Sequence, residues 1–584
     1  MVKWKGSREK TKYFVCFIVL WFLQMAAAFW FCTQKQGFHE DEYYTYYSTA
    51  RTNGFYVEDG EWMERDVYRN EFVVLPGQQF QYGLVKQVQS WDVHPPMYYW
   101  VFHTVASLSS GVFSKWTGLS VNLFFHGMNL ILLTYLSYLA AGRDERLPFP
   151  VLFVYGFSPA AMSGVVFIRM YEMLTTFVLL CAILHVRAVL GLQDGFRQKK
   201  SGWEEKVDPA DEGKPQPGEE GGSGGRRWTA LPVKTLLAMA AVTYVGFLTQ
   251  YYYFIFLFFL AIFFCIWMLW RDRNIRNCLR YGISQGMAFI LAYLTYPAFP
   301  GQMFKGQRGA QATENFFNLS NTFERICFFW DLMNRYVFGG LLGLMLLFLV
   351  AAVAVRRLGA AGKRQGTPGL VFYMLLFTAA GYFLTVSKTG LLLGDTSNRY
   401  QLPVYGIMVL LLVLGAAFLL RQTDGTWAAE EKGTSLPIRA ALHEKRMIGI
   451  AVTFSLALVA LSYVRADVVF LYREDMEQTA WAGKRAAADT PVVYFYKPGE
   501  EWCIWDVTNE LLMYPAVCFV SADSPDPVAD ARLEDADSLV VYLAKGMDAR
   551  EQIARLGGKD SASVQNGLQL VFEEKYCDVY DLSR

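Results

Sequence analysis

Long apolar segments recur along most of the sequence and are separated by polar loops. Each segment runs for roughly 17 to 24 residues, the length at which an α-helix crosses the hydrocarbon layer of a bilayer. The expected spans are residues 13–31, 118–140, 149–166, 171–192, 231–248, 252–270, 281–298, 336–355, 369–386, 400–420 and 447–466. This pattern predicts a polytopic α-helical membrane protein with about eleven transmembrane helices.

The basic residues in the loops assign a side of the membrane to each loop. Lysine and arginine accumulate in cytoplasmic loops, and every second loop here carries a basic cluster. The clusters are Arg143 and Arg146; Arg197, Lys199 and Lys200; Arg271, Arg273, Arg276 and Arg280; Arg356, Arg357, Lys363 and Arg364; and Arg421, Lys445 and Arg446. We therefore expect a multi-pass protein of the plasma membrane, with a cytoplasmic amino terminus and an extracytoplasmic carboxyl terminus.

The apolar stretch 97–113 is an exception, because its polar residues follow a helical period. One face carries His103, Ser107, Ser110 and Ser114, and the opposite face carries Tyr98, Val101, Val105, Leu108 and Val112. Such an amphipathic helix suits the membrane interface. A span at this point would also place the later basic clusters outside, so a juxtamembrane helix is predicted.

Changes in composition divide the chain into domains. Residues 1–466 form the expected transmembrane domain, with a first extracytoplasmic loop at 32–117 and a polar, glycine-rich cytoplasmic linker at 193–230. Beyond residue 466, four short apolar runs predict strands at 492–496, 517–520, 538–543 and 568–573, with helices near 501–513 and 548–556. Residues 467–584 are therefore expected to form a small extracytoplasmic α/β domain.

The overall composition excludes several classes of protein. The chain is 53% hydrophobic and has a net charge of +1, so it is neither an ordinary soluble protein nor a nucleic-acid-binding one. The nine cysteines include no CxxC pair, which argues against a zinc ribbon or a disulfide framework. The first apolar run follows several lysines but ends without a small-residue cleavage site, which indicates an uncleaved span rather than a signal peptide.

Candidate chemistry begins where the first span ends, with Glu40, Asp41 and Glu42 in succession. Adjacent carboxylates at the mouth of a membrane helix are costly unless water, a cation or a reaction uses them. On a helix, Asp41 and Glu42 point in different directions, so only one of them can face a given site. A solvated first helical turn, where acidic residues are favoured in any case, is the alternative.

A second cluster lies at the end of the first outside loop, in Asp92-Val93-His94-Pro95-Pro96. The proline pair holds the preceding residues extended, so His94 should be presented rather than packed. A simple helix-stopping turn is the alternative. Asp92 and His94 are candidate ligands for a divalent metal, but two candidates do not define a metal site, and no cofactor is assigned.

Two outside edges of later spans carry arginines, against the positive-inside trend. Arg169 precedes Tyr171 and Glu172, and Arg399 opens the tenth span. A guanidinium binds phosphate through a planar fork, so both arginines suit an anionic head group. Pairing of Arg169 with Glu172 on one helix face, or snorkelling of each arginine to the interface, is the structural alternative.

These motifs, taken in order, resemble the C-type glycosyltransferases that use polyprenyl-phosphate sugars. The resemblance is closest to the bacterial branch related to protein O-mannosyltransferases and to the lipid A aminoarabinose transferase. The matching features are Asp41-Glu42, the His-Pro-Pro-x-Tyr-Tyr run from His94 to Tyr99, Ser158-Pro159 followed by Arg169 to Tyr171, the turn Gln250 to Tyr253, and Arg399-Tyr400 with Pro403. The match extends over about residues 10–420.

The resemblance implies an extracytoplasmic active site and an inverting transfer of a hexosyl or pentosyl group. Asp41, with Glu42 beside it, would be the base that deprotonates an acceptor hydroxyl. Phosphate is already a good leaving group, so the reaction needs one base and cations for the developing charge. Residues expected to bind substrate are Asp92, His94, Arg169, Tyr171, Glu172, Gln250, Tyr251 and Arg399. The implied partners are a polyprenyl-phosphate-sugar donor, membrane lipid and a glycan, lipid or protein acceptor.

Two departures from the family pattern concern the site. Ile168 stands where relatives often carry an acidic residue before the arginine, and Glu172 follows instead. The insertion 59–90 is rich in aromatic residues and exceeds the minimal motif, so we expect extra interfacial helices or an acceptor surface there.

Two other functional classes compete with the enzyme. A transporter or flippase of lipid-linked sugars should show paired repeats and broken helices near the bilayer midplane, whereas the charged candidates here lie at the outer edge. An assembly or sensor protein would use the acidic residues only structurally. Replacement of Asp41 by Asn should abolish turnover in an enzyme but leave the flux of a flippase intact.

Overall fold

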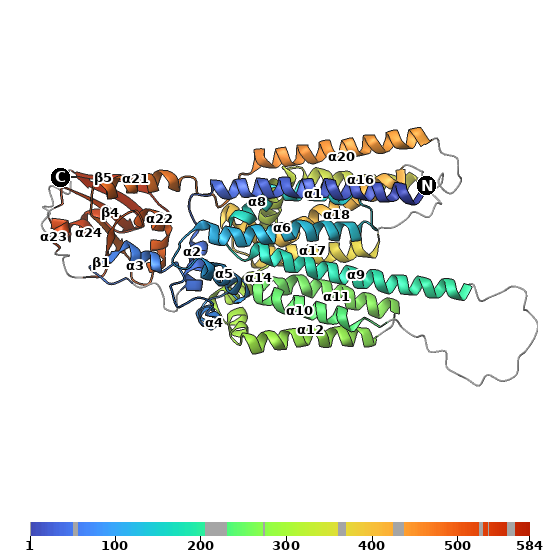
Figure 1. Ribbon diagram of the computed structural model, residues 1–584, viewed down its shortest axis with the longest axis horizontal. Coiled ribbons are helices and arrows are strands. Elements are labelled where there is room, and N and C mark those ends of the chain that lie inside the picture. The colour runs from blue at the N-terminus through green and yellow to red at the C-terminus, as the bar shows by residue number, and fades with distance from the viewer. Residues whose placement is uncertain are drawn as a thin grey trace, which may run out of the picture. The chain divides into compact units, whose positions relative to one another are not determined.

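The computed structural model describes residues 2–50, 57–204, 230–272, 275–359, 369–423, 437–524, 530–534, 536–556 and 567–583. The chain divides into two compact units, each assembled from separate stretches of sequence. The first unit contains residues 1–25, 125–164 and 170–467, and the second contains residues 26–124, 165–169 and 468–584. The first is helical throughout, and the second combines helices with a sheet (Figure 1).

The first unit is built from long apolar helices, of which α9 to α12 run side by side (Figure 1). Three of its helices, α1, α6 and α8, continue into the second unit. The helices are α1 (Val2–Gln34), α6 (Lys115–Ala140), α7 (Pro148–Gly156), α8 (Pro159–Val166), α9 (Tyr171–Glu204), α10 (Val233–Thr249), α11 (Tyr252–Asp272), α12 (Ile275–Thr295), α13 (Phe299–Phe304), α14 (Gln307–Phe317), α15 (Thr322–Phe338), α16 (Leu342–Gly359), α17 (Leu370–Thr389), η1 (Gly394–Tyr400), α18 (Leu402–Thr423) and α20 (Pro437–Arg465).

The predicted class, a polytopic helical membrane protein, is confirmed. In the described part of the chain, seven helices are long and apolar enough to cross a membrane, and nine spans result if each of two bent helix pairs is one span. Every predicted span overlaps a helix. The helix α10 has only 17 residues, and α12 is not among the seven. The count of eleven therefore stays a prediction.

Polar side chains join neighbouring helices inside this unit. His185 of α9 lies 2.9 Å from the Tyr281 hydroxyl of α12, and the Thr243 hydroxyl of α10 donates to Gln285 of α12 at 2.6 Å. Bonds of this kind hold helices together where lipid offers no hydrogen-bond partner. They give α12 specific partners although its sequence is less apolar than those of α10 and α11.

The second unit contains a six-stranded sheet in the order β1-β3-β2-β4-β6-β5. Its elements are α2 (Glu40–Ala50), β1 (Glu61–Glu64), α3 (Arg65–Asn70), α4 (Tyr82–Trp91), α5 (Met97–Leu108), α21 (Asp475–Ala487), β2 (Val492–Tyr496), η2 (Glu501–Val507), α22 (Thr508–Leu511), β3 (Ala516–Ser521), α23 (Ala531–Glu534), β4 (Ser538–Ala544), α24 (Ala549–Ala554), β5 (Leu568–Glu573) and β6 (Cys577–Ser583). The central strands β3, β2 and β4 are parallel. Their side chains are almost wholly buried, as expected for parallel strands covered on both faces.

Two strands of the sheet, β1 and β6, were not predicted. On one side β1, from the first loop, pairs antiparallel with β3, with Glu61 opposite Phe519; the blue strand lies among the red ones in Figure 1. On the other side β6 pairs antiparallel with β4 and β5. The first loop, expected to belong to the transmembrane domain, thus completes the carboxyl-terminal sheet.

The predicted juxtamembrane helix is present as α5, which has 12 residues and is too short to span a bilayer. Its polar face, however, is turned into the protein. His103 lies 2.8 Å from the Thr49 carbonyl and accepts from the Gln81 amide at 3.0 Å, and Ser107 accepts from the Phe80 amide. On the opposite face Leu108 is 76% exposed, whereas Tyr98 is buried.

The predicted cytoplasmic linker begins later than expected, because α9 continues to Glu204. Residues 205–229 of that linker lie outside the described residues. The same is true of several basic loop residues, including Arg273, Lys363 and Arg364. The sidedness inferred from those residues stays a prediction.

Candidate active site

The three acidic residues form the first turn of α2, immediately after the kinked stretch Gly37–His39. Acidic side chains there interact favourably with the helix dipole, but the surroundings of the three differ. The Asp41 side chain is 29% exposed, whereas that of Glu42 is fully buried. Only Asp41 and Glu40 are therefore accessible from solvent in this turn.

Asp41 lies close to the guanidinium of Arg169. Arg169 Nη2 is 3.9 Å from Asp41 Oδ1, and Nη1 donates to the Asp41 carbonyl at 2.9 Å. Nη1 also contacts the hydroxyls of Thr45 at 3.1 Å and Tyr99 at 3.0 Å. The arginine is thus held by one main-chain and two hydroxyl groups, which come from α2 and α5.

Glu42 is occupied in the interior. One carboxylate oxygen accepts from the Lys35 ammonium at 2.9 Å and from the His39 amide at 2.7 Å, and the other accepts from the Ile168 amide at 2.6 Å. Burial raises the pKa of Glu42 and lowers that of Lys35, although each partner acts to favour the charged form of the other. Lys35 also donates to the Phe470 carbonyl at 2.7 Å, so this pair ties four segments together.

Glu40 faces the carboxyl-terminal sheet. It accepts from the Lys575 ammonium at 2.6 Å and from the Tyr576 hydroxyl at 3.3 Å. Burial raises the pKa of Glu40, but His39 and Lys575 outweigh that effect, so the net pKa lies below its usual value. An ionised Glu40 thus connects the acidic turn to the chain just before β6.

Asp92 lies in the same region as Asp41. Burial, and then the carboxylates of Asp92 and Asp41, raise the pKa of Tyr44 to about 12. The same two carboxylates also act to raise the pKa of Tyr99. The structure therefore brings Asp41 and Asp92 close to one pair of tyrosines.

His94 follows in the bend between α4 and α5 and is half-buried. Within the described residues there is no group of three or more His, Cys, Asp or Glu side chains arranged to hold a metal ion. Asp92 and His94 consequently have no third ligand of these types in that part of the chain, and neither is assigned to a metal.

Tyr171, Glu172, Gln250, Tyr251 and Arg399 all belong to the first compact unit. Glu172 is buried at the start of α9, where it accepts from Asn129 at 2.7 Å. A Cβ atom at Gly164 would lie 2.6 Å from the Glu172 carboxylate, so this glycine allows the close approach. Glu172 therefore has a packing role inside the helical unit.

The remaining predicted residues of this unit gather around aromatic rings. Arg399 is buried in η1 and stacks over the ring of Tyr400, with 5.1 Å between guanidinium and centroid. Tyr171 packs edge-on against Tyr400 as well. The buried Gln250 ends α10, and the Tyr251 hydroxyl donates to Gln302 at 2.6 Å.

The motifs did not identify several residues that hold the acidic turn. Lys35 follows the first span between two glutamines. Like Thr45 and Tyr99, it is not among the predicted catalytic or substrate-binding residues. Lys575 and Tyr576 lie more than 500 residues away in sequence. A lone lysine directly after a membrane helix, seven positions before Glu42, was the one available signal.

No protein-family model and no curated protein sequence matches the chain. Among solved structures, it is similar to ArnT from Cupriavidus metallidurans bound to undecaprenyl phosphate, with 12% identity, 98% of each chain covered and a TM-score of 0.46. It is also similar to the oligosaccharyltransferase AglB from Archaeoglobus fulgidus, in complex with an inhibitory peptide and a dolichol-phosphate, with 11% identity, 97% of this chain and 74% of that chain covered, and a TM-score of 0.45. ArnT is the aminoarabinose transferase that was named above as a protein whose family the sequence motifs resemble.

Proposed function

We propose that this membrane protein is an inverting glycosyltransferase that moves a sugar from a polyprenyl-phosphate donor to an acceptor hydroxyl. The observation that carries the proposal is the Asp41–Arg169 pair. It places a solvent-accessible carboxylate beside a buried, anchored guanidinium at the end of a membrane helix. A base and a phosphate-binding cation are the two groups that such a reaction requires.

In the proposed reaction Asp41 accepts the proton of the acceptor hydroxyl while its oxygen attacks the anomeric carbon of the donor. The bond between that carbon and the phosphate oxygen breaks, and its electron pair leaves with the polyprenyl phosphate. Attack from the side opposite the phosphate inverts the anomeric configuration. Because the phosphate leaves readily, no general acid is needed, unlike glycoside hydrolysis, which uses two carboxyl groups.

Arg169 is assigned to the negative charge that develops on the leaving phosphate. Its Nη1 atom is used by Asp41, Thr45 and Tyr99, which orients the planar fork. Arg399, which is buried in the first compact unit, stays a separate prediction as a phosphate-binding residue. Asp92, close to Tyr44 and Tyr99, is assigned to hydroxyl groups of a substrate.

Glu42 is assigned a positioning role rather than that of a second base. Its carboxylate accepts hydrogen bonds from the Lys35 ammonium and from the backbone amides of His39 and Ile168. A carboxylate with both oxygens occupied in the interior has no room for an acceptor hydroxyl. It instead fixes the start of α2 relative to the Ile168–Arg169 segment.

The proposed setting is the outer face of the plasma membrane, with the amino terminus in the cytoplasm and residues 468–584 outside. The donor carries a hexose or a pentose, and the acceptor is a glycan, a lipid or a protein hydroxyl. The apolar helices provide the surface on which the lipid chain of the donor rests.

A transporter of lipid-linked sugars is the second candidate, and the bent helix pairs favour it. The α7–α8 pair bends by 59° and the α15–α16 pair by 89°, and broken helices line the substrate sites of secondary transporters. The two functions differ in one requirement, because transport needs a closed membrane whereas transfer does not.

The test uses purified protein in detergent micelles with radiolabelled undecaprenyl-phosphate glucose, mannose and arabinose and a membrane extract as the acceptor source. The proposal expects release of free undecaprenyl phosphate together with label in a new glycoside of inverted configuration. Flipping of donor in sealed proteoliposomes, without release of undecaprenyl phosphate in micelles, would establish the transporter instead.

A further inference from the structure

A small hollow lies at the carboxyl ends of β2 and β4 in the second unit. Its volume is about 130 Å³, similar to that of the cavity of roughly 150 Å³ that holds one benzene ring in a well-studied protein. The strand order β3-β2-β4 reverses direction at β2, since β3 lies on one side of it and β4 on the other. In parallel sheets, ligands bind in the crevice at the carboxyl ends of the strands where the order reverses.

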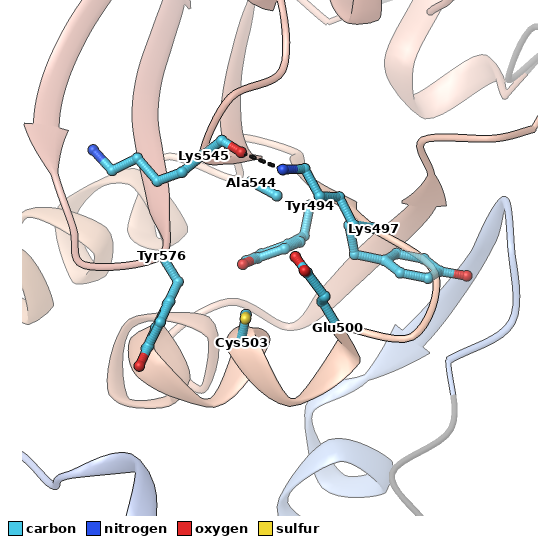
Figure 2. Close-up of a pocket in the computed structure, with 8 residues that line it drawn as sticks. Tyr494, Lys497, Glu500, Cys503, Ala544, Lys545 and Tyr576 are labelled. Atoms are coloured by element: carbon cyan, nitrogen blue, oxygen red, sulfur yellow. Dashed lines mark hydrogen bonds between the residues drawn. The ribbon is translucent and has the colours of Figure 1, made fainter. Parts of the chain in front are cut away.

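Polar groups converge on this hollow. Figure 2 shows Tyr494, Glu500 and Cys503 pointing toward one another across it, with Tyr576 at one wall. The Tyr494 side chain is fully buried, and its hydroxyl contacts the Cys577 thiol, which is a weak hydrogen-bond partner. A polar ligand in the hollow would give this buried hydroxyl a stronger partner.

Both lysines that line the hollow, Lys497 and Lys545, have hydrogen-bond partners within the protein. Lys497 donates its ammonium to the Lys545 carbonyl at 2.6 Å (Figure 2), and the Lys545 ammonium pairs with Asp578. Both lysines are thus engaged by the protein, while the Glu500 carboxylate faces the hollow. A ligand with several hydroxyl groups suits an acceptor carboxylate and a phenol hydroxyl better than a phosphate does.

Aromatic rings provide the apolar part of the recognition. The Tyr576 ring lies 5.0 Å from the Trp502 ring, nearly perpendicular to it. The C–H face of a sugar ring packs well against such surfaces, which have an apolar body and a polar tip. A ring-sized volume, tyrosine rings and an acceptor carboxylate together suit a monosaccharide.

The hollow adjoins the acidic turn. The Tyr576 hydroxyl donates to Glu40 at 3.3 Å, and Glu40 immediately precedes Asp41. From the other wall, Cys503 lies close enough to Tyr44 to influence its pKa, as do Asp41 and Asp92. The hollow is therefore connected to the acidic turn through Tyr576, which lines the hollow and contacts Glu40.

We propose that this hollow binds one sugar ring of the acceptor, so that the acceptor is a glycan or a glycolipid. The inference rests on the proposed function for the identity of its ligand as an acceptor, but not for the existence of a sugar-binding site. Tyr494 and Glu500 hold the hydroxyl groups of the ring, and Tyr576 packs against its face.

The test measures binding, so that it does not depend on turnover. Saturation-transfer NMR on the full-length protein in nanodiscs would use methyl glycosides of glucose, mannose, galactose and N-acetylglucosamine as probes. Tyr494→Phe removes one hydroxyl group, and Glu500→Gln removes one charge. Tyr580→Phe is the matched control, because Tyr580 lies on β6 and does not line the hollow.

The expected result is saturable binding of at least one glycoside, weakened about tenfold by Tyr494→Phe or Glu500→Gln and unchanged by Tyr580→Phe. Asp41→Asn should bind the glycoside normally. Equal binding by all variants, no binding of any glycoside, or displacement of the glycoside by inorganic phosphate would overturn the proposal. Glycoside binding without any transferase activity would retain the sugar site and reject the glycosyltransferase.

Discussion

The Lys35 ammonium lies 2.9 Å from Glu42 Oε2, and neither side chain is exposed. Removal of one partner of a buried ion pair leaves an uncompensated charge in the interior. Lys35→Met should therefore destabilise the protein by about 3–5 kcal/mol. Urea unfolding of the detergent-solubilised protein measures the change, with the exposed Lys484→Met of α21 as control.

The double variant Lys35→Met/Glu42→Gln tests the same pair from the other side. Because the second substitution removes the stranded charge, the double variant should be more stable than Lys35→Met alone. Additive losses would show that the two side chains act independently.

Asp41→Asn should lower sugar transfer by about 10²- to 10⁴-fold, the usual contribution of a general base. Asn occupies nearly the same volume, so the melting temperature should stay within about 2 °C of the wild-type value. Asp66→Asn, at a highly exposed aspartate of the same loop, should leave transfer unchanged. A fully active Asp41→Asn protein would reject Asp41 as the base.

Arg169→Lys keeps the charge but loses the planar fork. One ammonium is not expected to replace the contacts with Asp41, Thr45 and Tyr99 while also facing a phosphate. We expect kcat to fall by roughly 10²-fold with a smaller change in KM for the donor. The control is Arg146→Lys, at a half-exposed arginine that pairs with Asp144; a change confined to KM would make Arg169 a ground-state binding residue.

Asp475 should make stability depend on pH. Burial, followed by Glu474, Glu574 and Asp506, raises its pKa to about 7, although Lys35 acts in the opposite direction. A carboxyl with a raised folded-state pKa binds more protons when folded, so stability falls as the pH rises from about 4 to about 7. Asp475→Asn should therefore raise the melting temperature at pH 8 and change it little at pH 4.

Thermal scans at several pH values between 4 and 8 measure this effect. The exposed Glu477→Gln on the same helix provides a variant of equal charge change. If both variants shift the melting temperature alike at every pH, the effect comes from net charge and not from the buried position of Asp475.

Sequence predicts best the helices and strands whose formation does not depend on one particular partner segment. The membrane helices need only length and apolarity, and β2 to β4 are continuous apolar runs buried on both faces. The strand β1 is different, since Glu61-Trp62-Met63-Glu64 has no strand pattern of its own and is defined by its pairing with β3. In β6, Asp578 and Asp581 obscured the alternation, and each pairs with a basic side chain.

The same limit applies to the site. Sequence spacing showed that Asp41 and Glu42 point in different directions, but the choice between them depended on Lys35 and the Ile168 amide. For α5, the amphipathic pattern predicted the helix but not the partners of its polar face. His103 and Ser107 meet backbone groups of neighbouring segments, and those backbone groups leave no trace in a pattern of side chains.

The pairing of β1 with β3 joins residue 61 to residue 519, and this separation has a consequence for biosynthesis. A ribosome delivers the acidic turn and its loop long before it delivers the edge to which that loop attaches, and contacts so distant in sequence form late. Until residues 516–519 are synthesised, residues 61–64 therefore have no strand to pair with. We expect a chain that ends about one hundred residues early to keep most of its membrane helices but to lack the contacts of Glu40 with Lys575 and Tyr576. Such a chain should insert into the membrane without the proposed transferase activity.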